Sequence, residues 1–167
     1  MPTQLYYELL KELETTQKRQ TSWRWKIAQA LEGLRVSLAS HLGIEYLHYN
    51  EGQYRYVDLF TPANDLFHLS ASNVIEFVER TPVVNVHVVI ALEHDVRIVP
   101  CICPIQVRLI HNTVEYRITR ENGHWTSNLD VIRTWICKAI KNNLRQVLFV
   151  QTNNIETEKC LCLPTSM

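Results

Sequence analysis

The segment from residue 83 to residue 119 constrains the fold most, because apolar and polar residues alternate along it with a period of two. It contains four short strand patterns, VVNVHVVIA, VRIVPCI, IQVRLI and TVEYRIT, which are separated by EHD, CP and HN. A period of two places successive side chains on opposite faces of a sheet, and turn residues at short intervals indicate hairpins. The segment therefore predicts an antiparallel meander with one buried face.

The N-terminal quarter of the chain has helical periodicity instead. Apolar residues recur at every third or fourth position over residues 3–18 and again over residues 22–41, which predicts two helices. The two stripes are formed by Leu5, Leu9 and Leu13, and by Trp23, Ile27, Leu31, Leu34 and Leu38. The helices would meet near residues 20–21, either as a hairpin or as one long helix with a break.

The middle of the chain predicts a hairpin and a short helix. EYLHYN and QYRYVDLF flank Glu51-Gly52, so we expect a tyrosine-rich β-hairpin there. Farther along, Ser72 or Asn73 is placed to cap a short helix in SASNVIEFVER. Pro82 would end that helix, because the residue before a proline is biased away from helical geometry.

The remaining elements complete an α+β order. Pro100 and Pro104 cannot donate ladder hydrogen bonds, so their strands are expected to bulge or to lie at an edge. Asn128 opens a helix to about Asn142, and residues 147–150 either extend it or form a last strand. We expect an antiparallel sheet of about five to seven strands, packed against two N-terminal helices and one C-terminal helix.

The length of 167 residues fits a single domain. We expect this domain to span residues 1–152, with a helical N-terminal portion over 1–42 and the sheet with its other helices over 44–152. The last residues, 153–167, show no clear periodicity and are expected to form a mobile tail.

Charge and targeting patterns exclude several classes of protein. Lys plus Arg and Asp plus Glu both number 17, so no global basic field attracts nucleic acid. The N-terminus lacks the pattern of a secretory signal, and no apolar run is long enough for a transmembrane helix. Five cysteines are an odd number, which favours free thiols in a reducing compartment. We therefore expect a cytoplasmic protein that does not enter a membrane.

The cysteines raise the question of a metal site. Cys101 and Cys103 form one C-x-C pair, and Cys160 and Cys162 form another. Four thiolates suit tetrahedral zinc, but the usual spacing within a pair is two to four residues, because a turn must aim both sulfurs at the metal. We expect Cys101 and Cys103 to pack in the core and no cofactor to be bound, with zinc as the alternative.

Several histidines and acids are candidates for acid–base chemistry. The candidate catalytic residues are His87, Glu93, His94, Asp95 and His111. An imidazole beside carboxylates has a stabilised cationic form, which suits a small hydrolase or nuclease. Three polar residues in a row between two apolar strands are equally typical of a solvated turn. The chain has no phosphate-binding glycine loop, no nucleophile elbow and no H-E-x-x-H motif.

Two aromatic segments are candidate partner surfaces. Residues 18–26 hold four cations and two tryptophans, a composition typical of protein interfaces and also of nucleic-acid contacts. The hairpin offers tyrosines, which are favoured at partner surfaces. The residues expected to bind a partner are Arg24, Trp25, Lys26, Tyr46, His48, Tyr54 and Tyr56.

These observations favour a non-enzymatic binding or regulatory module in the cytoplasm. Such a protein would act through a protein partner, as an accessory, inhibitor, immunity-type or chaperone-like protein, and would form a homodimer or part of a complex. The alternatives are a small hydrolase or nuclease at the histidine–carboxylate segment and nucleic-acid binding through residues 18–26.

Overall fold

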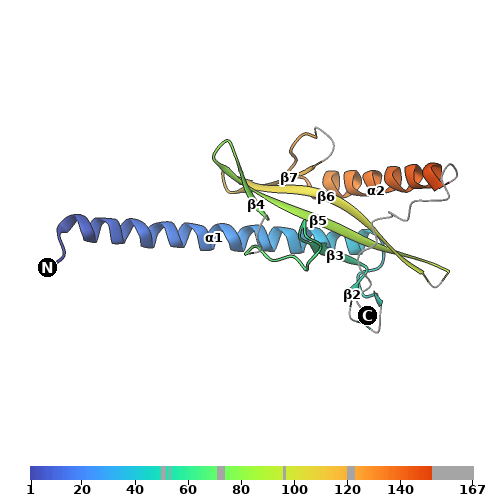
Figure 1. Ribbon diagram of the computed structural model, residues 1–167, viewed down its shortest axis with the longest axis horizontal. Helices are drawn as coiled ribbons and strands as arrows, with labels where there is room; N and C mark the ends of the chain where they lie inside the picture. Colours follow the sequence, from blue (N-terminus) through green and yellow to red (C-terminus); the bar gives the residue numbers. More distant parts are fainter. Residues whose placement is uncertain (50–51, 53, 71–73, 96, 120–122, 152–167) are drawn as a thin grey trace.

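The computed structural model describes residues 1–49, 52, 54–70, 74–95, 97–119 and 123–151. In this part of the chain, two helices accompany a five-stranded antiparallel sheet, and a separate two-stranded hairpin lies beside them (Figure 1). The α+β class with an antiparallel sheet is therefore confirmed. Neither of the described helices is long and apolar enough to cross a membrane.

One N-terminal helix replaces the two that the sequence predicted. Helix α1 runs without interruption from Gln4 to His41, a length of 38 residues. The expected junction at residues 20–21 is Gln-Thr and contains neither glycine nor proline, so nothing there breaks the helix. Helix α1 ends just before Gly43, whose positive φ of 69° is a conformation that glycine adopts without steric cost.

The large sheet is built around its two longest strands. Its order is β3-β5-β6-β7, and β4 also pairs with β5. Strands β3 and β4 share one edge of β5, where β3 pairs with residues 87–90 and β4 with residues 81–84. The strands are β1 (His48–Tyr49), β2 (Tyr54–Arg55), β3 (Val57–Phe60), β4 (Ile75–Val78), β5 (Thr81–His94), β6 (Arg97–Ile110) and β7 (Thr113–Ile118).

The predicted meander is real but has three strands instead of four. The Cys-Pro step does not divide β6, and β6 pairs with β5 in one register from Arg97 to Arg108. Strand β7 pairs with β6 only from Ile105 onward, and the amide of Thr119 donates to the carbonyl of Pro104 at 3.0 Å. Pro100 and Pro104 thus lie where β6 has β5 as its only paired strand in the described sheet, which confirms the expected edge position.

The short helix predicted after residue 72 was wrong. Residues 75–78 form β4 and pair antiparallel with the start of β5. Glu79 and Arg80 have φ values of 49° and 67°, so both adopt the left-handed conformation of a two-residue hairpin turn. The β-branched and aromatic residues of IEFV favour a strand once a neighbouring strand is present.

The C-terminal helix begins where the sequence predicted. Helix α2 runs from Leu129 to Gln151, and Asn128 caps it. The side-chain oxygen of Asn128 accepts from the amides of Asp130 at 2.9 Å and Val131 at 3.4 Å. Residues 147–150 continue this helix instead of forming a strand. Residues 153–167, the predicted tail, lie outside the described residues.

The core lies between the helices and one face of the sheet. Alternate residues of β5 and β6 point toward the helices, as the period of two requires. The principal members of this core are Ile27, Leu31, Leu34 and Leu38 of α1, Ile132 and Ile136 of α2, Val84, Val86 and Val88 of β5, and Cys103, Ile105 and Val107 of β6.

Tyr116 of β7 places a hydroxyl inside this core. Because this hydroxyl is buried, we expect the protein to lose stability at alkaline pH. Its side chain is 3% exposed, and the hydroxyl donates to the carbonyl of Ala30 at 3.3 Å. Burial raises the pKa of Tyr116 to about 12, above its unfolded value of about 10. The neutral phenol therefore contributes fully to the free energy of unfolding below pH ~10. About 2 kcal/mol of that free energy is lost as the pH rises from ~10 to about 12.

The phenylalanine variant isolates this effect. Between pH ~10 and ~12, wild type should lose about 2 kcal/mol more unfolding free energy than Tyr116→Phe in urea titrations, since the variant has no phenol to ionise. Parallel losses in the two proteins would contradict the prediction.

Candidate partner-binding surface

The first half of α1 extends beyond the sheet (Figure 1). Every side chain from residue 4 to residue 22 is exposed except that of Thr15, which is half-buried. The first fully buried residue of α1 is Ile27. We call residues 4–22 the projecting segment, because α1 is not yet covered by the sheet there.

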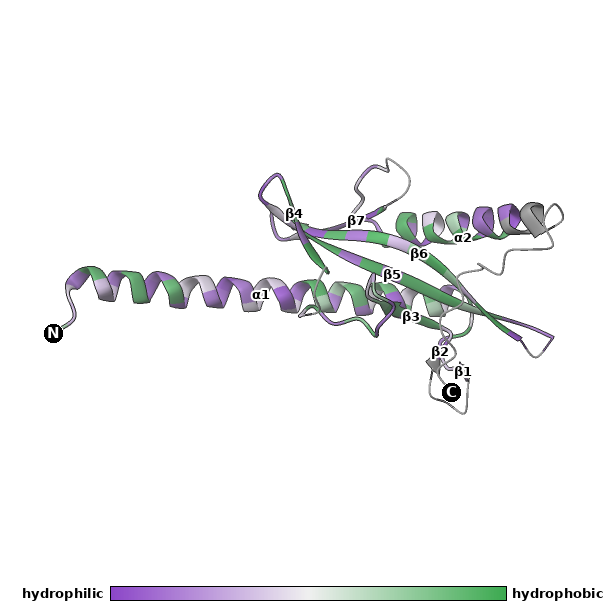
Figure 2. Cartoon of the chain, in the orientation of Figure 1, coloured by the Kyte–Doolittle hydropathy of each residue, from purple (hydrophilic) through white to green (hydrophobic). Residues whose placement is uncertain are grey.

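Five large apolar side chains fall on one side of the projecting segment by helical spacing. The ribbon of this segment carries green, hydrophobic stretches (Figure 2). The exposed fractions are 62% for Leu5, 53% for Tyr6, 61% for Leu9, 38% for Leu10 and 53% for Leu13. We call these five residues the exposed stripe. A contiguous apolar patch of this kind on a protein surface typically marks a site of interaction.

The exposed stripe is on the side of α1 that faces the core farther along. Leu9 and Ile27 are 18 positions apart, which is about five turns of an α-helix, so both side chains point the same way. The same spacing relates Leu13 to Leu31. The apolar side of α1 therefore continues past the sheet, and only its second half is covered by the rest of the described chain.

The basic-aromatic residues predicted to bind a partner follow the projecting segment. Arg24 is exposed, and Trp25 is 60% exposed. Lys26 is half-buried, and its ammonium donates to the side chain of Asn112. Trp23 packs against the core. Arg24 and Trp25 thus remain available to a partner, whereas Lys26 links α1 to the turn between β6 and β7.

The tyrosine-rich hairpin is only partly a free surface. Tyr46 is 87% exposed, and His48 in β1 is exposed as well. The hydroxyl of Tyr56 donates to a carboxylate oxygen of Glu93 at 2.7 Å, which ties this tyrosine to β5. Tyr54 belongs to β2, and its side chain lies outside the described part.

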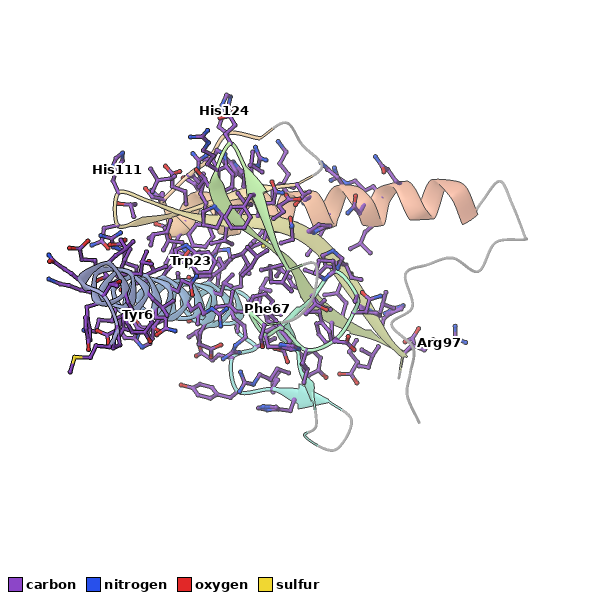
Figure 3. The ribbon with its side chains drawn as sticks, turned by 60° about the vertical axis from the view of Figure 1, so that its left-hand side comes forward. Tyr6, Trp23, Phe67, Arg97, His111 and His124 are labelled. Atoms are coloured by element: carbon purple, nitrogen blue, oxygen red, sulfur yellow. The ribbon has the colours of Figure 1, made fainter. Side chains whose placement is uncertain are left out.

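The structure keeps Glu93, His94 and Asp95 together at the end of β5 but separates them from His87 and His111. Glu93 and His94 end β5, and His94 lies 3.2 Å from the carboxylate of Asp95 with both side chains solvated. His87 is seven residues earlier in β5, roughly 23 Å away by strand rise. His111 lies at the opposite end of the sheet from Arg97, the residue that pairs with His94 (Figure 3). The described fold does not bring these groups into one cleft.

The described cysteine pair, Cys101 and Cys103, does not belong to a cluster of metal ligands. Cys101 and Cys103 are buried in the core, and burial raises the pKa of the Cys101 thiol. Cys160 and Cys162 lie outside the described residues. Among the residues that the structure does describe, no group of three or more His, Cys, Asp or Glu side chains is placed to bind a metal ion.

A cleft of about 670 Å³ between α1 and β3 holds charges that the sequence did not reveal. The guanidinium of Arg35 donates to both carboxylate oxygens of Glu32, at 2.9 and 2.5 Å. This hydrogen bonding lowers the pKa of Glu32 and raises that of Arg35, so both stay charged. Arg55 lies 3.7 Å from Glu32. Asp58, which also lines the cleft, brings the carboxylates there to two against two guanidinium groups, and the contact of Arg55 with Glu32 connects β2 to α1.

The sheet face away from the helices carries a second polar group that the sequence did not reveal. Gln106 is 6% exposed, and its amide nitrogen donates to Glu76 at 2.7 Å and to Asn85 at 3.0 Å. Its amide oxygen accepts from the guanidinium of Arg117 at 2.7 Å. Arg117 in turn lies over the ring of Trp125, 4.5 Å from its centroid. These contacts give both polar atoms of the Gln106 side chain hydrogen-bond partners, and they link β6 to β4, β5 and β7.

The comparisons with known proteins identify no relative. No family model, no curated protein and no solved structure matches the chain. Among the described surfaces of the molecule, the exposed stripe is the most distinctive.

Proposed function

We propose that the protein is a non-enzymatic binding module that acts through a protein partner, and that the partner docks on the exposed stripe. The observation that carries this proposal is the solvation of five large apolar side chains on a helix that extends past its own domain. Burying one such side chain is worth about 1.5–3 kcal/mol, so a partner that covers several of them gains substantial affinity.

The other side of the projecting segment supports the same mode of binding. Glu8, Lys11 and Glu14 are exposed there, so the helix is amphipathic without a domain beneath its apolar side. An amphipathic helix binds a partner by placing its apolar side in a groove or against another helix. The spread of the candidate catalytic residues supports a binding role over an enzymatic one.

The chemistry of the thiols supports a reducing compartment. Cys101 and Cys137 are free thiols, and burial raises the pKa of both. Free thiols persist where the surroundings are reducing, so we place the module in the cytoplasm.

Site-specific photo-crosslinking in the cells that make this protein tests the docking surface. A photoreactive amino acid at Leu9 should form a covalent adduct with a protein chain, because Leu9 lies in the exposed stripe. The matched control is the same amino acid at Lys11, which is also exposed and lies on the opposite side of the same turn. Adducts that are absent at both positions, or equally abundant at both, would contradict the proposal.

A further inference from the structure

Resting on the proposed function, we infer that the partner is a second copy of this chain, whose projecting segment lies antiparallel along the first. The exposed stripe of each copy would then lie along residues 16–23 in the helix of the other copy. Three features of α1 support this arrangement: the distribution of its charges, the spacing of residues along one side and the position where its domain begins.

The charges along α1 are separated by sign. Residues 4–14 contain three glutamates and one lysine, whereas residues 15–26 contain four cations and no acid. Two parallel copies would place like charges side by side. Two antiparallel copies place the acidic part of each helix beside the basic part of the other, which is the complementary arrangement.

The spacing of residues defines a register for the antiparallel pair. Positions alternate by three and four along one seam, as in a heptad repeat. The seam consists of Tyr6, Leu9, Leu13, Thr16, Gln20 and Trp23. In heptad terms, Tyr6, Leu13 and Gln20 occupy position a, and Leu9, Thr16 and Trp23 occupy position d. When each position a faces a position d of the other copy, the layers are Tyr6–Trp23, Leu9–Gln20 and Leu13–Thr16. The two-fold axis then passes between residues 14 and 15.

The charged positions beside the seam fit this register. Glu12 and Arg19 are both exposed, and both fall on heptad position g. In an antiparallel pair, position g of one helix faces position g of the other, so Glu12 of each copy meets Arg19 of the second copy. In a parallel pair, Glu12 would face the neutral Gln17 instead.

The domain begins where the helical pairing ends. Trp23, the last residue of the seam, is half-buried, and Ile27 is the first fully buried residue of α1. The projecting segment measures about 28 Å by helical rise. Each sheet therefore lies beyond the N-terminus of the other copy's helix, and the pairing uses the whole length of helix that the domain leaves open.

Sedimentation equilibrium of the purified full-length chain tests this pairing. Wild type should form a dimer in a concentration-dependent manner. Glu12→Arg alone, or Arg19→Glu alone, should weaken the dimer about tenfold, because either change turns two attractions per dimer into two repulsions. The combined Glu12→Arg/Arg19→Glu variant should recover wild-type affinity to within about threefold, since the pair is restored with its charges exchanged.

Lys11→Glu serves as the matched control. It changes the net charge by the same amount as Arg19→Glu, but Lys11 lies on the side of the helix away from the seam, so the dimer should keep its affinity. Circular dichroism should show equal helix content in all four variants, which separates lost pairing from lost folding.

Different results overturn different parts of the argument. A dimer that ignores both single reversals, or one that the combined variant fails to restore, overturns the antiparallel register. A wild-type monomer at about 100 µM overturns self-pairing, because that concentration exceeds the Kd of most specific complexes. If wild type is a monomer but Leu9 crosslinks to a different protein in cells, the proposed function stands without self-pairing. If Leu9 crosslinks to no protein, the proposed function and the self-pairing both fail.

Discussion

Leu34→Ala is expected to lower the free energy of unfolding by about 4 kcal/mol. Leu34 is 0% exposed and lies in the centre of the α1 stripe that packs on the sheet. Truncation removes the transfer free energy of the lost carbons and leaves a cavity, because a rigid helix above a rigid sheet closes the space only partly. Urea denaturation followed by circular dichroism measures the change.

Leu9→Ala is the matched control for this prediction. It makes the same chemical change on the same side of the same helix, but Leu9 is 61% exposed. In dilute solution, where no second chain covers the projecting segment, we expect a change of no more than about 0.5 kcal/mol. Similar losses in the two variants would mean that the projecting segment is packed against the domain, and would remove the basis of the proposed function.

The scaffold could be predicted because its signals are local. The alternation in β5, β6 and β7 shows directly which residues face the core, and Asn128 marks the start of α2 through its capping chemistry. Such signals depend on side chains close in sequence, so one chain is enough to interpret them.

The errors arose where a pattern supports two structures. The run VIEFV is too short to distinguish a helix from a strand, and the adjoining β5 decides in favour of β4. The Cys-Pro step resembles a break, yet Pro104 fits a continuous β6 because β7 ends beside it. In both cases a neighbouring strand, absent from the local pattern, determines the result.

The candidate surface was partly visible in the sequence. The stripe of Leu5, Leu9 and Leu13 predicted a helix, but helical periodicity cannot reveal whether a sheet lies beneath the stripe. The contacts of Glu32 with Arg55, and of Gln106 with Glu76, join residues far apart in the chain. They depend on strand register and helix placement, which only the folded structure provides.

Gln106→Glu is expected to destabilise the protein by about 3 kcal/mol, although the two side chains have nearly the same shape. The amide nitrogen of Gln106 donates to the carboxylate of Glu76 and to the side chain of Asn85. A carboxylate at this position cannot donate, so two acceptors lose their donor. Its negative charge also meets that of Glu76 at a nearly buried position, where Gln106 is 6% exposed. Urea denaturation near neutral pH measures the effect.

Exchanging the two groups should reverse most of this loss. In the double variant Glu76→Gln/Gln106→Glu, the amide at position 76 donates to the carboxylate at position 106, and Arg117 still donates to the same carboxylate. We expect the double variant to recover about 2 kcal/mol relative to Gln106→Glu alone. Because Glu76→Gln alone replaces an acceptor with an amide that still contacts Gln106, it should cost about 1 kcal/mol or less. If the double variant equals the sum of the single ones, the two residues are not coupled, and the polar face contributes little to the order of the central strands.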